Sequence, residues 1–359
     1  MKDKILFVNS RLSDGGAERV MTLLANEFAN HYDVSMILVR EKREEIYQLD
    51  SRIEKIQLEY GNSGTIRRQL KRVLYVRKYI REIDPNLVIS FVEDINVVTL
   101  LACIGLNKKI IVSERCNPKS NIGFVGTFVR SFIQKFIYLL ADKVIFQTEY
   151  AKSCFSLKIQ KRSVVIPNPV NPEIPEPYTG MRNKEIVAVG RYEKQKNFPM
   201  LIEAFAKFVK EHLDYKLTIY GEGPLRSEYK LLLNELGISE KVNLAGYVSD
   251  VNNKMKSAMM YVSSSDYEGI SNSMIEALAM GVPTICTDCP VGGARMMIND
   301  GKNGLLTPVG DVESLYEAMS KVADDEKLTQ VLAENAIKIR ENYSIEKIFK
   351  MWLGAIKDV

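Results

Sequence analysis

The chain has 359 residues, of which 46% are hydrophobic and 26% are charged, so we expect a globular protein of two ordinary-sized domains. The longest apolar stretch, residues 97–106, is too short to cross a bilayer, and the apolar core at residues 5–8 is too short for a secretory signal. Two histidines give little support to Ser-His-Asp hydrolysis, and five cysteines without a signal fit reduced thiols in the cytosol.

Short apolar runs alternate with helical patterns through the first half of the chain. The runs predict buried strands at residues 5–8, 34–39, 87–92, 109–112 and 144–146. The helical patterns occupy residues 17–30, 65–83, 94–105, 123–141 and 149–158. Strands and helices that alternate in this way predict βαβ units around a parallel sheet.

A segment with five prolines, residues 166–180, separates this half from a second alternation and predicts an interdomain linker. The second half predicts strands at residues 185–189, 216–220, 242–245, 260–263, 284–286 and 305–306. Its helices are expected at residues 198–211, 224–236, 251–258, 272–280, 311–323, 327–342 and 345–356. The expected fold class is therefore α/β, with two doubly wound domains, residues 1–170 and 171–342, and a ligand cleft between them.

The most informative stretch runs from Tyr261 to Gly304 and contains two glutamates, Glu268 and Glu276, on either side of a predicted helix start. Ser271 or Asn272 is expected to cap that helix, and Gly281 and Pro283 to end it. The backbone N–H groups at the helix start predict an anion site. This layout would suit a nucleotide diphosphate-sugar. The backbone amides would bind its phosphates, one acid would bind its ribose hydroxyls and the other acid would bind the hydroxyls of its sugar. Solvated surface glutamates are the alternative.

Three further loops follow predicted strands. Gly15 and Gly16 precede the first helix and allow close approach of a ligand to the backbone, although most such pairs simply form turns. Residues 190–197 contain Arg191 and Lys196, which would stabilise a leaving diphosphate without a metal or, alternatively, form a solvated basic loop. Gly221 and Gly223 form a turn near the expected nucleotide. The Cys286-x-x-Cys289 pair lacks the further ligands of a zinc site, so no essential metal is expected.

Charge is unevenly distributed along the chain. Residues 1–178 carry a net charge of +7 and residues 179–359 a net charge of −3, within a total of +4. Basic and apolar residues alternate in residues 65–83, and phenylalanines recur every fourth residue in residues 119–141. Each pattern alone is typical of a solvated face or of a helix core. Together they favour a peripheral membrane patch, whereas no nucleic-acid-binding module accompanies them.

These motifs together resemble the retaining glycosyltransferases of family 4, which have the GT-B fold of two Rossmann-like domains. The resemblance covers nearly the whole chain and rests on the order and spacing of six segments: GGAERV at 15–20, SERCNP at 113–118, IPNPV at 166–170, GRYEKQKN at 190–197, GEGP at 221–224 and EGISNSMIEALAMGVPTICTD at 268–288. It implies that a final helix, about residues 343–359, packs back on the first domain.

The resemblance also implies roles for individual residues. The catalytic residues would be Arg191, Lys196 and Glu268. The two cations would bind the pyrophosphate, and the carboxylate would bind the hydroxyls of the transferred sugar. The donor would be bound by Gly15, Gly16, Gly221, Gly223, Gly269, Ile270, Ser271, Asn272 and by Glu276, which would hold the ribose. The acceptor side would include Glu114, Arg115 and Asn117. Glu114 and Arg115 stand where many relatives have a histidine, and Met296 stands where close relatives have a carboxylate.

The resemblance implies a reaction without cofactor or metal: transfer of a hexose or N-acetylhexosamine, with retention, from a UDP-sugar to a lipid-linked or glycan acceptor in bacterial surface polysaccharide synthesis. The expected location is the cytoplasm, peripheral on the inner face of the cell membrane. A nucleotide-sugar epimerase of the same fold and a non-catalytic carbohydrate-binding protein are the alternatives.

Overall fold

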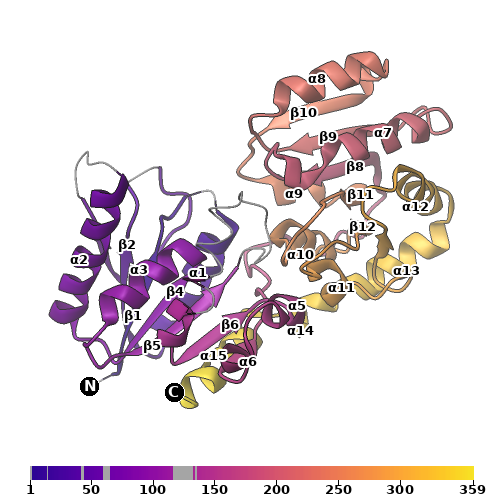
Figure 1. The fold of residues 1–359 in the computed structure, drawn as a ribbon. Helices are drawn as coiled ribbons and strands as arrows, with labels where there is room; N and C mark the ends of the chain where they lie inside the picture. Colours follow the sequence, from indigo (N-terminus) through magenta and orange to yellow (C-terminus); the bar gives the residue numbers. More distant parts are fainter. Residues whose placement is uncertain (1, 14, 42–43, 60–64, 116–131, 134–135) are drawn as a thin grey trace. The chain divides into compact units, whose positions relative to one another are not determined.

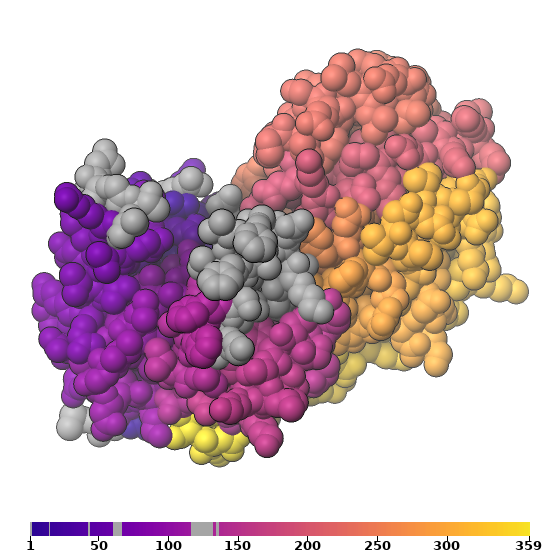
Figure 2. All heavy atoms as spheres, in the orientation of Figure 1, coloured from indigo at the N-terminus to yellow at the C-terminus, as the bar shows by residue number. Residues whose placement is uncertain are grey.

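The computed structural model describes residues 2–13, 15–41, 44–59, 65–115, 132–133 and 136–359 (Figure 1). The chain divides into two compact units. Unit 1 comprises Met1–Pro169 together with Ile345–Val359, and unit 2 comprises Val170–Ser344. Figure 2 shows unit 1 in indigo to magenta, with its last residues in yellow, and unit 2 in rose to yellow.

Unit 1 is built on a seven-stranded sheet in which every pairing is parallel, in the order β3-β2-β1-β4-β5-β6-β7. The strands are β1 (Lys4–Asn9), β2 (Asp33–Leu38), β3 (Glu54–Gln57), β4 (Leu87–Phe91), β5 (Lys109–Glu114), β6 (Lys143–Phe146) and β7 (Ser163–Val165). The helices are α1 (Gly16–Ala29), α2 (Thr65–Ile83), α3 (Glu93–Cys103), the 3₁₀ turn η1 (Ile137–Leu140), α5 (Glu149–Ser153), α6 (Leu157–Gln160) and α15 (Ile345–Lys357).

The central strands of unit 1 are buried because helices cover the sheet. All five residues of β4 are buried, as are the last five of β1. Helix α1 packs on β1, β2 and β4, and α15 packs on α1, where Phe28 and Phe349 meet edge to face at 4.8 Å. The only tryptophan, Trp352, is fully buried and stacks on Phe91 at 5.6 Å. Helix α15 therefore belongs to the core of unit 1, although it follows unit 2 in the sequence.

Unit 2 has a six-stranded parallel sheet in the order β10-β9-β8-β11-β12-β13. Its strands are β8 (Asn183–Val189), β9 (Lys216–Tyr220), β10 (Val242–Gly246), β11 (Ala258–Ser263), β12 (Thr284–Thr287) and β13 (Leu305–Thr307). Its helices are η2 (Lys194–Lys196), α7 (Phe198–Phe208), α8 (Arg226–Glu235), η3 (Ser239–Lys241), α9 (Val251–Met255), α10 (Asn272–Ala279), α11 (Gly293–Met297), α12 (Val312–Asp324), α13 (Glu326–Ala336) and α14 (Ile339–Asn342).

Some elements differ from the sequence-based expectations. The sheet of unit 1 has two strands that were not predicted, β3 and β7, which lie at its edges and contain no fully buried residue. The helices expected at residues 149–158 and 327–342 are each divided into two. Most of the helix expected at 123–141 lies outside the described residues, and its end is the 3₁₀ turn η1.

The two sheets share one topology, which fixes where ligands bind. In each, the strand order reverses beside the first strand, between β1 and β4 in unit 1 and between β8 and β11 in unit 2. In open α/β sheets, ligands bind at the carboxyl ends of the strands at such a switch point. The loops that follow these four strands are therefore the expected functional loops. Among the described residues, no helix is both long and apolar enough to cross a membrane.

Candidate active site

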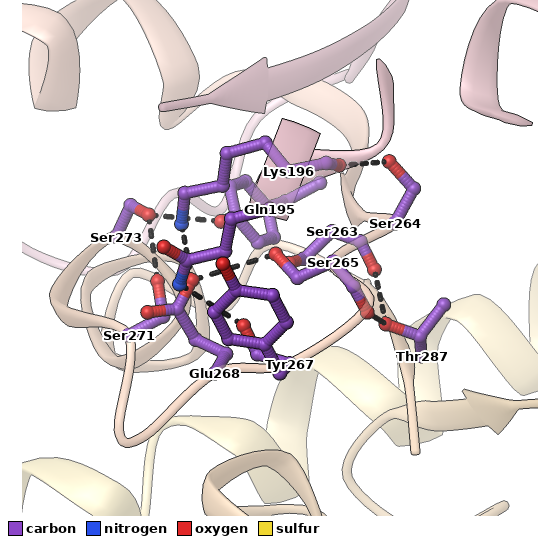
Figure 3. A network of polar contacts seen from close by, with 11 residues as sticks. Gln195, Lys196, Ser263, Ser264, Ser265, Tyr267, Glu268, Ser271, Ser273 and Thr287 are labelled. Atoms are coloured by element: carbon purple, nitrogen blue, oxygen red, sulfur yellow. Dashed lines mark hydrogen bonds and ion pairs between the residues drawn. The ribbon is translucent and has the colours of Figure 1, made fainter. Parts of the chain in front are cut away.

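An ion pair joins the two loops at the switch point of unit 2 (Figure 3). Lys196 ends η2 after β8, and its ammonium nitrogen binds Oε2 of Glu268 in the loop after β11. The side chains are 17% and 22% exposed, so the pair is only partly screened by water. The hydroxyl of Ser265 donates to the same carboxylate oxygen at 3.4 Å, and that of Ser264 donates to the backbone carbonyl of Lys196 at 2.9 Å. Two of the three predicted catalytic residues are thus in direct contact.

Hydrogen bonds between the same two loops fix the position of this pair. The backbone N–H of Asp266 donates to the carbonyl of Gln195 at 2.9 Å, and the Gln195 amide donates to the carbonyl of Tyr267 at 3.0 Å. The Asn197 amide donates to Oδ1 of Asp266 at 2.7 Å, while its own oxygen caps α7. Asn197 has a left-handed φ of 43°, which asparagine tolerates better than most residues. Sequence analysis did not predict Gln195, Asp266 or Asn197 as site residues. Asn197 could have been recognised, because asparagine at a helix start is typical of an N-cap.

Arg191 does not join the ion pair. Its side chain is 70% exposed and its guanidinium lies 3.2 Å from the carboxylate of Glu193. Two predicted donor-binding glycines, Gly221 and Gly223, pack against the backbone of the loop that carries Arg191. A Cβ on Gly221 would lie 1.9 Å from the Gly190 carbonyl oxygen, and a Cβ on Gly223 would lie 2.5 Å from the Tyr192 carbonyl oxygen. Only glycine permits this approach of two chain segments. Donor contacts by Arg191, Gly221 and Gly223 stay predictions.

The helix start at α10 has the predicted boundary but not the predicted cap. Ser271 occupies the N-cap position, yet its side chain makes no cap hydrogen bond, because its hydroxyl pairs with that of Ser273 at 3.0 Å. The Tyr261 hydroxyl meets the same Ser273 hydroxyl at 2.9 Å. Asn272 is the first helical residue, and Gly281, with a left-handed φ of 69°, follows the helix end as expected.

Close backbone packing holds the loop before α10. A Cβ on Gly293 would lie 1.8 Å from the carbonyl oxygen of Gly269 and 2.8 Å from the nitrogen of Ile270, so residue 293 must be glycine. Sequence reasoning missed this support, which no local pattern reveals. Glu276 lies one turn into α10 and is 2% exposed, so it is a buried carboxylate rather than a solvated surface charge. Its contact with a ribose stays a prediction.

In unit 1, a carboxylate already lies at the Gly15-Gly16 helix start. Glu18 folds back so that its Oε2 would lie 1.6 Å from a Cβ on Gly15, and its Oε1 accepts a hydrogen bond from the Ser10 hydroxyl. A negative side chain in the first turn is favoured by the helix dipole. A donor phosphate that approaches Gly16 must therefore displace Glu18 or avoid it.

The predicted acceptor residues Glu114 and Arg115 lie at the end of β5 in a buried polar cluster. Glu114 is 2% exposed and accepts a hydrogen bond from the Tyr138 hydroxyl at 2.5 Å. The Arg115 guanidinium donates to Oδ1 of Asn168 at 2.6 Å. Burial lowers the pKa of Arg115 to about 9, which leaves it charged at neutral pH. Asn117 lies outside the described residues.

The Cys286 and Cys289 thiols are both buried in unit 2. Burial raises the pKa of both thiols, that of Cys289 to about 11, so both stay protonated at neutral pH. Within the described ranges, no three His, Cys, Asp or Glu side chains are grouped as metal ligands.

Comparison with known proteins identifies the family of the chain. The family model described as glycosyltransferase family 4 matches residues 14–174, and that of the glycosyl transferases group 1 matches residues 172–339. Two Campylobacter jejuni enzymes are similar over nearly their full length. One, GalNAc-alpha-(1->4)-GalNAc-alpha-(1->3)-diNAcBac-PP-undecaprenol alpha-1,4-N-acetyl-D-galactosaminyltransferase, is 28% identical over 99% of both chains. The other, N-acetylgalactosamine-N,N'-diacetylbacillosaminyl-diphospho-undecaprenol 4-alpha-N-acetylgalactosaminyltransferase, is 29% identical over 92% of this chain and 93% of its own.

Solved structures show the same fold. HepE from Anabaena, in complex with UDP, has a TM-score of 0.81 at 18% identity over 99% of this chain and 100% of its own. Sucrose-phosphate synthase from Thermosynechococcus elongatus has a TM-score of 0.85 at 18% identity over 99% and 98%. With two parallel-sheet Rossmann-like units of the GT-B type, the chain belongs to the glycosyltransferases that combine an amino-terminal family 4 domain with a carboxy-terminal group 1 domain.

Proposed function

We propose that the protein transfers a hexose or N-acetylhexosamine from a UDP-sugar to a lipid-linked glycan in bacterial surface polysaccharide synthesis, with retention and without a metal. The observation that carries this proposal is the Lys196–Glu268 ion pair at the switch point of unit 2. The names of the Campylobacter relatives, which act on undecaprenol-linked diphosphates, support a lipid-linked acceptor. UDP bound to HepE supports a uridine nucleotide donor.

The ion pair suggests how donor binding prepares both residues. Without donor, the Glu268 carboxylate neutralises the Lys196 ammonium. A donor diphosphate carries more negative charge and competes for Lys196, which frees the carboxylate of Glu268 to accept hydrogen bonds from sugar hydroxyls. Lys196 and the exposed Arg191 then face the diphosphate with two positive charges, the role that a metal has in other sites.

In the proposed reaction, the acceptor oxygen attacks the anomeric carbon from the face that the diphosphate leaves. The bond from that carbon to the phosphate oxygen breaks, its electron pair stays on the UDP oxygen, and the acceptor proton moves to the same UDP. No protein general base is required, and the protein contributes positioning and charge stabilisation.

Membrane association at the inner face of the cell membrane is part of the proposal. Helix α2 exposes Leu70 and Leu74, at 60% and 64%, one turn apart among its basic residues. Unmodified chain is expected to sediment with vesicles of anionic lipid at low salt. The variant Leu70→Ser/Leu74→Ser should sediment less, and Leu213→Ser/Leu231→Ser, which removes two exposed leucines of unit 2, should not. Equal sedimentation of the two variants would refute this location.

The donor and the mechanism are tested with a panel of UDP-hexoses and UDP-N-acetylhexosamines. We expect donor hydrolysis with one of them, an axial-to-axial anomeric product by NMR in the presence of acceptor, and full activity in EDTA. An inverted product would refute retention, loss of activity in EDTA would refute metal independence, and inactivity with every UDP-sugar would refute the donor class.

A further inference from the structure

The amino end of α10 carries a serine that is placed to cap the helix but does not cap it. Ser271 occupies the N-cap position with an extended backbone, at φ −71° and ψ 123°, and its side chain makes no cap hydrogen bond. Serine is among the strongest N-cap residues, because its hydroxyl oxygen can accept a hydrogen bond from the second or third N–H of a helix. The residue type and the backbone therefore favour a cap that the structure lacks.

Three other helices of unit 2 show what a cap side chain does in this protein. Asn197, Asp311 and Asp325 each accept a hydrogen bond, at 2.9–3.3 Å, from the backbone N–H three residues later. At α10 the equivalent N–H belongs to Met274. Neither this N–H nor that of Ser273 has a hydrogen-bond partner among the residues that the structure describes. A cap would take one of these two donors.

Two further hydroxyls hold the Ser271 side chain in its non-capping position. The Ser271 hydroxyl pairs with that of Ser273 at 3.0 Å (Figure 3), and Ser273 in turn pairs with the Tyr261 hydroxyl at 2.9 Å. Tyr261 is 1% exposed and lies in β11, where its backbone is in register with Val187 and Thr284 on the neighbouring strands. The buried tyrosine therefore gives the two serine hydroxyls a fixed partner.

The uncapped helix end lies in the candidate active site. Ser271 follows Glu268 by three residues, and Glu268 is the partner of Lys196, the cation proposed to bind the donor diphosphate. Backbone N–H groups at a helix start, together with the helix dipole, favour an anion. A hydroxyl that capped α10 would compete with phosphate oxygens for the same N–H groups. The arrangement thus gives up a cap hydrogen bond and leaves its donors to a ligand.

We propose that Tyr261 and Ser273 are positioning residues for the donor diphosphate: they hold the Ser271 hydroxyl off the start of α10, so that the N–H groups there bind phosphate oxygens. This inference rests on the proposed function, since it takes the donor to be a UDP-sugar. Tyr261 and Ser273 act through Ser271 and need no contact with the reacting atoms. Removing their hydroxyls releases that of Ser271, which then caps the helix and competes with the donor.

The test compares UDP affinity, measured by calorimetry, among matched variants of the full chain. Tyr261→Phe/Ser273→Ala removes both hydroxyls together, so that no buried tyrosine hydroxyl is left without its partner. This double variant should bind UDP roughly threefold to tenfold more weakly, because a hydrogen bond to the diphosphate is lost. Its Tm without ligand should stay the same or rise, because the helix gains a cap.

A rescue variant and a control complete the series. Adding Ser271→Ala to the double variant removes the competing hydroxyl but keeps the backbone N–H groups, so most of the lost UDP affinity should return. The matched control Tyr229→Phe removes another buried tyrosine hydroxyl of unit 2, away from α10, and should bind UDP within about twofold of the unmodified chain.

Amide exchange supplies a readout that distinguishes positioning from a structural role. In the ligand-free double variant, hydrogen exchange measured by NMR at the N–H groups of residues 273 and 274 should be slower than in the unmodified chain, because the Ser271 hydroxyl then protects one of them. If the three hydroxyls only stabilised the fold, their removal would speed exchange there and lower Tm.

Three results overturn the inference: equal UDP affinity in the double variant and the unmodified chain, no recovery on adding Ser271→Ala, or exchange at residues 273 and 274 that is unchanged or faster in the double variant. The proposed function fails in a different way. If the unmodified chain bound no UDP, the donor class itself would be wrong and this inference would fall with it. If the unmodified chain bound UDP and the double variant bound it as tightly, only the inference would fail.

Discussion

Replacing Lys196 by alanine is expected to lower the turnover number by about 10²–10³, the usual cost of removing one preorganised charge or donor from a developing negative charge. The ammonium group sits at the switch point of unit 2, where it is held by Glu268 and by the interlocked loops after β8 and β11. The effect should be on turnover more than on the fold. Lys194→Ala, which removes an exposed lysine two residues away in η2, is the matched control and should retain nearly full activity.

The stability cost follows from the burial of the pair. Side chains that are 17% and 22% exposed lie between a surface pair, worth about 0–1 kcal/mol, and a buried pair, whose disruption costs about 3–5 kcal/mol. We therefore expect Lys196→Ala to destabilise unit 2 by about 2 kcal/mol, which lowers Tm by roughly 4–8 °C for a unit of this size. Lys196→Ala/Glu268→Gln should recover part of this loss, because no unpaired carboxylate remains, while transfer stays low.

The assay measures transfer of a radiolabelled sugar from the UDP-sugar found in the donor panel, and calorimetry measures Tm for the same preparations. Two results would refute the reasoning. One is transfer by Lys196→Ala equal to that of the unmodified chain, and the other is an equal loss in Lys194→Ala. If the double variant lost as much stability as the sum of its single variants, the two side chains would not interact in solution.

Three further predictions concern local structure. Gly293→Ala should destabilise unit 2 by about 3 kcal/mol and weaken UDP binding, because its Cβ would overlap the Gly269 carbonyl. The control Gly354→Ala, which has open space around its Cβ, should stabilise α15 by about 0.5–1 kcal/mol. Urea unfolding measures both changes in stability, and equal effects would contradict the close packing at Gly293. In a Cys116→Ser background, the partly exposed Cys154 should be alkylated first at pH 8. Cys289 should react only as the pH rises toward its pKa of about 11, where the thiolate forms. Mass spectrometry locates the label, and early labelling of Cys289 would contradict its burial. Phe91→Leu should change the fluorescence of Trp352, its stacking partner, while leaving UDP affinity within about twofold, and an unchanged spectrum would contradict the stacking.

Sequence patterns predict the central strands of both sheets and the edge strands of unit 2, β10 and β13, but they miss the edge strands of unit 1. β1 and β4 are continuous apolar runs because parallel central strands are buried on both faces. β3 and β7 are half exposed and short, so they lack that pattern. Their pairing with β2 and β6 depends on the completed sheet, and no local propensity reveals it.

In the candidate site, too, the sequence predicts some features and misses others. Lys196 and Glu268 could be selected from their positions after predicted strands, but their direct contact depends on two loops 72 residues apart in sequence. The steric need for glycine at Gly293 arises only when α11 packs against the Gly269 carbonyl. Likewise, Glu18 folds over the Gly15 helix start because Ser10 is near enough to bind it. These relations depend on three-dimensional packing, which a single sequence does not display.

The place of α15 in unit 1 has a consequence for biosynthesis. All of unit 2 is synthesised before the helix that carries Trp352, so the sheet that begins with β1 receives its last covering element only after unit 2 has been made. Unit 2 has a continuous sequence and can fold as soon as it emerges, whereas nascent unit 1 exposes the apolar surface around Phe28 and Phe91 for that whole interval. Cellular chaperones should therefore engage the first-made half of this polypeptide longer than the second.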